Sequence, residues 1–120
     1  MGPWKRRFQA FHEGETAMAL DIVILAESGD PEITVPIRVN EHARLLGIVD
    51  DATLPLLSRL RDYYGDAEYE PQDLDLLAAE LESVAERVQT DNELVMIVAE
   101  LMNLVTLAKR LGRKIVAIAD

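Results

Sequence analysis

The residues best suited to chemistry gather in one acidic, tyrosine-rich stretch. Between Asp62 and Glu82 the chain holds eight carboxylates and no lysine or arginine, and all three tyrosines lie within it. Tyrosine offers a large contact area with a polar tip at low entropic cost, and interfaces are enriched in it. Carboxylates attract and pair with the arginines and lysines of a partner. The stretch therefore predicts a loop that binds a basic protein partner through Tyr63, Asp66, Glu68, Tyr69, Glu70 and Asp73.

Two other interpretations of these carboxylates stay open. Acids near the start of a helix are favoured by the helix dipole, so the stretch also fits an ordinary solvated face. Asp66, Glu68 and Glu70 alternate along the chain, but the twelve-residue calcium loop with its central glycine is absent. We therefore predict no metal and no cofactor.

Few residues in this chain are arranged for catalysis. There is no cysteine, and no serine lies in a nucleophile-elbow pattern. Neither a glycine-rich phosphate loop nor a dinucleotide fingerprint is present. His42, between Glu41 and Arg44, offers general acid–base chemistry in principle, which keeps a small enzyme or ligand-binding protein as an alternative. A lone histidine in a helix is more often a surface or boundary residue, and the sequence as a whole predicts a non-enzyme.

The first seventeen residues differ in character from the rest. They contain Trp4, Phe8 and Phe11, which would share one face of a helix, and three consecutive cations at positions 5–7. We predict an N-terminal extension over residues 1–17, followed by a single domain over residues 18–120. The extension is interpreted as docked on its own domain or on a sister chain, as disordered, or as an anchor for a membrane surface or a partner groove.

The element that must organise the domain is a helix from Thr90 to Gly112. Thr90 and Glu93 fit a capping box at its start, and Gly112 suits a left-handed cap at its end. The helix is apolar on most of its circumference and so must be covered on several sides. This excess of apolar surface motivates a second functional hypothesis, a self-associating structural protein that forms a homodimer.

The remaining elements predict an α+β fold of order β-β-α-α-α-α-β. Strands over residues 19–26 and 33–39 form an N-terminal hairpin, in which Pro36 makes the second strand an edge strand. Helices are predicted over 40–49, 54–64 and 71–89, before the long helix. The last strand, over 114–120, is apolar enough for an interior position and joins the hairpin in a small three-stranded sheet packed against a helical layer.

The composition of the chain limits which class of partner and which cellular compartment we expect. The net charge of −10 argues against nucleic acid and favours a basic partner or simple solubility. No secretory signal and no membrane-spanning run is visible, so we expect a cytoplasmic protein without integral membrane association. In small size, acidity and lack of catalytic motifs the chain is similar to bacterial toxin-neutralising immunity proteins. This likeness rests on composition alone and implies no site residues.

Overall fold

The computed structural model describes residues 19–61 and 66–119. The strands are β1 (Ala19–Leu25), β2 (Pro31–Arg38), β3 (Ala67–Tyr69) and β4 (Ile115–Ala119). The α-helices are α2 (Val39–Ile48), α3 (Leu74–Arg87) and α4 (Asn92–Leu111), and two short 3-10 helices are η1 (Leu57–Leu60) and η2 (Pro71–Asp73). The predicted α+β class is confirmed.

The strands form one sheet in the order β2-β1-β4-β3, and each neighbouring pair is antiparallel. The predicted hairpin is β1 and β2, and the last strand pairs with β1 in an interior position, as expected. Strand β2 lies at one edge, which suits Pro36 because proline has no N–H to donate to a further strand. The opposite edge is β3, which comes from the acidic stretch.

The predicted three-stranded sheet is therefore wrong by one strand. Strand β3 is only three residues long, Ala67-Glu68-Tyr69, and its burial alternates from half-buried to exposed to buried. Three residues carry too little alternation for a pattern to be recognised in the sequence. The strand forms because its partner β4 presents a free edge and because the Tyr69 ring fills the core beneath it.

The helix predicted over residues 54–64 is also corrected, because within the described residues it is reduced to the short 3-10 helix η1. Side chains from other elements take carbonyls that a longer α-helix would need. The Tyr69 hydroxyl donates to the Leu56 carbonyl at 2.7 Å, and the His42 ring lies 2.5 Å from the Leu60 carbonyl. Tertiary hydrogen bonds thus compete with the local helix.

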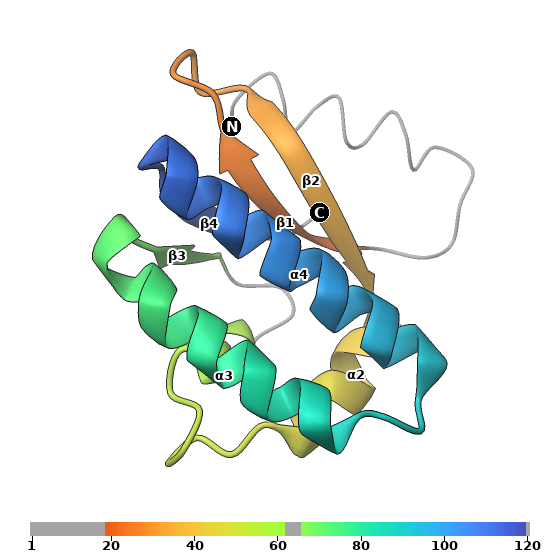
Figure 1. The fold of residues 1–120 in the computed structure, drawn as a ribbon. Helices are drawn as coiled ribbons and strands as arrows, with labels where there is room; N and C mark the ends of the chain where they lie inside the picture. Colours follow the sequence, from red (N-terminus) through yellow and green to blue (C-terminus); the bar gives the residue numbers. More distant parts are fainter. Residues whose placement is uncertain (1–18, 62–65, 120) are drawn as a thin grey trace, which may run out of the picture.

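The core lies between one face of the sheet and the helices. In Figure 1, α4 crosses the sheet and α3 packs beside it, and apolar residues of the sheet, α2, η1, α3 and α4 form one buried cluster. The broad apolar surface of α4 is therefore covered within the same chain, by α3 on one side and the sheet on the other. Its exposed large apolar residues are Val95, Met96 and Leu111.

The ends of α4 follow the prediction in part. Gly112 adopts a left-handed conformation with φ 68°, and its N–H bonds back into the last turn, as a glycine cap should.

The start of α4 differs from the prediction, because Asp91 and not Thr90 is the cap. The Asp91 carboxylate accepts the Leu94 N–H at 3.3 Å. Asp91 is also held by two hydrogen bonds from Arg44, at 3.0 and 3.1 Å. The hydrogen bonds from Arg44, followed by that of the Leu94 N–H, hold the pKa of Asp91 below its ordinary value against partial desolvation.

Over residues 19–61 and 66–119, the helices fall short of the length and apolar character that crossing a bilayer requires.

Candidate acidic binding surface

The acidic stretch forms one edge of the sheet and the turn that leads into α3. We define the acidic edge as Asp66, Glu68, Glu70, Asp73 and Asp75. Asp73 is half-buried and the other four residues are exposed. The structure thus brings four predicted binding residues, Asp66, Glu68, Glu70 and Asp73, onto one surface around β3. Tyr63, and the predicted docking residues Trp4, Phe8 and Phe11, lie outside the described residues.

The fold supplies the cations that this stretch of sequence lacks. Lys114, just before β4, places its Nζ 2.5 Å from Glu68, and Lys109 of α4 pairs with Asp75. Arg59 lies 3.6 Å from the Asp73 carboxylate. The hydrogen bond with Glu68 raises the pKa of Lys114, and the charge of nearby Glu70 adds to this effect. Five carboxylates therefore meet three cations, and the surface is less negative in space than along the chain.

Two carboxylates of the acidic edge form no ion pair with a described lysine or arginine. Asp66 accepts the backbone N–H of Ala119 at 3.2 Å, which ties the start of β3 to the end of β4. Glu70 is exposed, and its backbone N–H donates to Asp73 at 3.1 Å, which fixes the turn into η2. The first contact uses the Asp66 carboxylate itself, whereas the second holds the Glu70 backbone, and the side chain of Glu70 stays exposed.

Tyr69 belongs to the core, so its predicted place on the binding surface is corrected. The alternation of β3 turns Glu68 to the opposite face from Tyr69, and the tyrosine is only 1% exposed. Its hydroxyl donates to the Leu56 carbonyl, so the buried polar tip is satisfied. Burial raises the pKa of Tyr69 well above its ordinary value of 10.0. The tyrosine that looked like an interface residue anchors the edge strand instead.

The Arg59 side chain contacts the edge strand β3. Its guanidinium donates to the Glu68 carbonyl at 3.0 Å and lies 5.5 Å from the centroid of the Tyr69 ring, within range of a cation–π contact. An open strand edge invites pairing with another chain, and this side chain occupies a carbonyl on that edge. The Arg59 side chain therefore hinders the addition of a further strand to β3 at this carbonyl.

A buried carboxylate, Glu80 of α3, was missed by the sequence-based interpretation. It is 3% exposed and accepts the backbone N–H groups of Leu56 and Leu57, at 3.1 and 2.9 Å. A signal was available, because Glu80 lies three residues after Leu77 and four before Val84 and so shares their inward face. With His42 and Tyr69, it fixes the segment that carries η1.

His42, considered for acid–base chemistry, is itself buried, and its Nε2–H donates to the Leu60 carbonyl.

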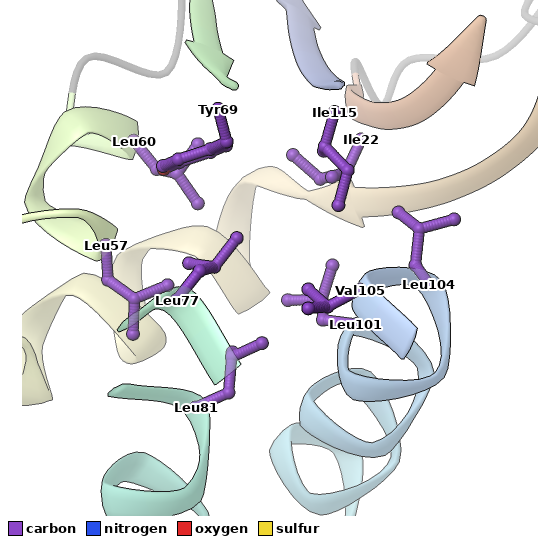
Figure 2. Close-up of a pocket in the computed structure, with 10 residues that line it drawn as sticks. All are labelled: Ile22, Leu57, Leu60, Tyr69, Leu77, Leu81, Leu101, Leu104, Val105 and Ile115. Carbon is purple, nitrogen blue, oxygen red and sulfur yellow. The ribbon is translucent and has the colours of Figure 1, made fainter. Parts of the chain in front are cut away.

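The apolar cavity under the sheet is a packing void. In Figure 2 side chains from β1, β3, β4, η1, α3 and α4 point toward one centre, and all of the lining surface is apolar. The enclosed volume is about 10 Å³, which is about the size of one water molecule, and an apolar void of this kind stays dry. It offers no space for a ligand.

Within residues 19–61 and 66–119, no cluster of three His, Asp or Glu residues is placed to hold a metal ion.

Comparison of the chain with protein-family models, with curated proteins and with solved structures found no match.

Proposed function

We propose that this protein is a binding module for a basic protein, which it contacts through the acidic edge. The observation that carries the proposal is the set of exposed carboxylates Asp66, Glu68 and Glu70, held on and beside a short edge strand. Their backbone is fixed on both sides, by the pairing of β3 with β4 and by the turn into η2. A fixed row of charges loses little entropy on binding, which favours recognition.

The internal ion pairs leave this surface open to exchange. Glu68 and Lys114 both keep about half of their side-chain surface in solvent, at 53% and 43%. Exposed pairs of this kind contribute little to stability. An arginine of the partner binds a carboxylate through two parallel hydrogen bonds, which a lysine cannot form. The partner's arginines therefore replace Lys114 at Glu68 and add contacts at Glu70 and Asp66.

The proposal is tested by capture of partners from host lysate at low and high salt. The test variant is Glu68→Lys/Glu70→Lys, which reverses two charges of the acidic edge. The matched control is Glu82→Lys/Glu86→Lys, which makes the same change in charge at two exposed positions of α3. We expect wild type and control to capture the same basic protein, and the test variant to lose it. Salt should weaken the capture, because it screens exposed charges.

The outcome that contradicts the proposal is equal capture by the test variant and the control, or capture that does not change with salt. Near-ultraviolet circular dichroism of both variants shows whether their folds are intact. Neither variant replaces a buried residue, so both are expected to fold.

A further inference from the structure

The second face of the sheet is buried although no described helix lies on it. Val23 of β1 and Ile118 of β4 are 0% and 3% exposed, and Asp21 beside them is 2% exposed. The cluster that contains Val23 and Ile118 is completed by Leu25 and Val116, which all lie in the sheet itself. The helices pack on the other face, with the main core (Figure 1).

A single sheet cannot bury the centre of its own outer face. A strand side chain on an uncovered face stands in solvent, because its neighbours lie beside it and not above it. The strands and helices of residues 19–61 and 66–119 therefore do not by themselves account for the burial of Val23 and Ile118. The chain outside these ranges consists of residues 1–18, residues 62–65 and Asp120.

We propose that this face is the docking surface for residues 4–11 of the same chain. The proposal goes beyond the partner-binding function. Trp4, Phe8 and Phe11 are three of the six aromatic residues in the protein and supply the apolar area that Val23 and Ile118 require.

The charges of the segment and of the face are complementary. Three consecutive cations, Lys5, Arg6 and Arg7, lie between the aromatic residues of the segment. The face carries the buried carboxylate of Asp21, and Glu68 borders it because Glu68 pairs with Val116 across β3 and β4. A buried carboxylate is tolerated where a cation or several hydrogen-bond donors meet it. The aromatic residues of the segment match the apolar face, and its cations match the carboxylate of Asp21 within that face.

The length and attachment of the segment also fit. The chain enters β1 at Ala19, and β1 is the strand that carries Asp21 and Val23. Residues 4–11 would span about 12 Å as a helix. Three neighbouring strands, β2, β1 and β4, span about 10 Å at the usual spacing. Residues 12–18 reach up to about 23 Å when extended, which is enough for the chain to fold back over the face.

The test uses Trp4, which is the single tryptophan of the full-length chain, and the absence of cysteine from the chain. A nitroxide label, which quenches tryptophan only at short range, is attached at Pro36→Cys or at Met96→Cys. Pro36 is exposed on β2 and pairs with Asp21, which places it on the second face. Met96 is exposed on α4, which packs on the other face, and serves as the control. Trp4 emission is recorded for unlabelled and labelled protein over a range of dilutions.

We expect blue-shifted Trp4 emission that the Pro36→Cys label quenches several-fold more than the Met96→Cys label does. Dilution should leave both readings unchanged, because the contact lies within one chain. Trp4 emission like that of free tryptophan, or equal quenching by the two labels, would overturn the proposal. Quenching and a blue shift that both disappear on dilution would overturn it in favour of a second copy. A further variant, Phe8→Ser/Phe11→Ser, should shift Trp4 emission to the red, and an unchanged emission would contradict the role of these aromatics.

Discussion

At the scale of single residues, polar side chains in the interior fix the irregular part of the chain. The segment around η1 has backbone hydrogen bonds of its own, but they are short-range turns rather than a long helix. Two of its amides and two of its carbonyls also bond to Glu80, Tyr69 and His42, which lie on three other elements. Buried polar groups must be satisfied, so each of these side chains is a structural requirement of the fold.

Loss of the Glu80 carboxylate should destabilise the protein strongly. The change Glu80→Ala leaves the amides of Leu56 and Leu57 buried without an acceptor. We expect a loss of about 3 kcal/mol in the free energy of unfolding, because each unsatisfied group costs about 1–3 kcal/mol. The control Glu82→Ala, on the exposed side of the same helix, should change it by less than about 0.5 kcal/mol. Urea unfolding measures both variants, and equal midpoints would show that Glu80 is not structural.

Tyr69 should make the stability of the protein fall at alkaline pH. Its pKa is raised in the folded state, so the stabilisation is complete below the unfolded value of about 10 and is lost as pH rises through the folded value. The variant Tyr69→Phe loses one hydrogen bond, which should cost about 1 kcal/mol at neutral pH. It should also lose less stability than wild type above about pH 10. The test is the unfolding midpoint of wild type and of Tyr69→Phe, measured across this pH range. An equal fall in the stability of both proteins would contradict the prediction.

At the scale of elements, the length of a helix or strand decides whether the sequence pattern predicts it. The α4 helix has twenty residues with a strong apolar period and a glycine stop, and its prediction is confirmed. The β1–β2 hairpin and the interior position of β4 follow from equally plain patterns. Strand β3 and helix η1 are three and four residues long. Their conformation comes from Tyr69 and Glu80 acting across the core, which no local pattern contains.

The same limit applies to the acidic edge. Its carboxylates were predicted from the sequence, and the structure does place Asp66, Glu68 and Glu70 on a common surface. The cations beside them, Lys114 and Arg59, lie 46 and 9 residues from Glu68 in the chain. Pairing at the longer separation depends on the order of strands in the sheet. A run of like charges in a sequence therefore overstates the negative potential of the folded surface, because it leaves out cations from other parts of the chain.

Two glycines at helix ends should respond in opposite ways to the same substitution. Gly112 has a positive φ, so Gly112→Ala should cost about 1 kcal/mol of folding free energy. Gly47 lies within α2 with a helical backbone and open space around it, so Gly47→Ala should add about 0.5 kcal/mol. Thermal unfolding measures the two variants side by side. A stabilising effect at Gly112 would contradict the left-handed cap.

At the scale of the whole molecule, the net charge of −10 supports the basic partner that we propose. Such a field accelerates association with a basic protein and repels nucleic acid. The described acidic edge retains more carboxylates than cations even after its internal pairing. Both faces of the sheet are buried, one by helices and one, in our proposal, by the N-terminal segment. The edge of the sheet at β3 is then the surface that our proposal assigns to the partner.

The most direct test of this account is the salt dependence of binding to the captured partner. The dissociation constant is measured at several salt concentrations for wild type, for Glu68→Gln/Glu70→Gln and for the matched control Glu82→Gln/Glu86→Gln. We predict weaker binding and a shallower salt dependence for the first variant alone, because two charges that contact the partner are removed. If all three proteins show the same affinity and the same slope, the acidic edge is not the binding surface and the proposed function is contradicted.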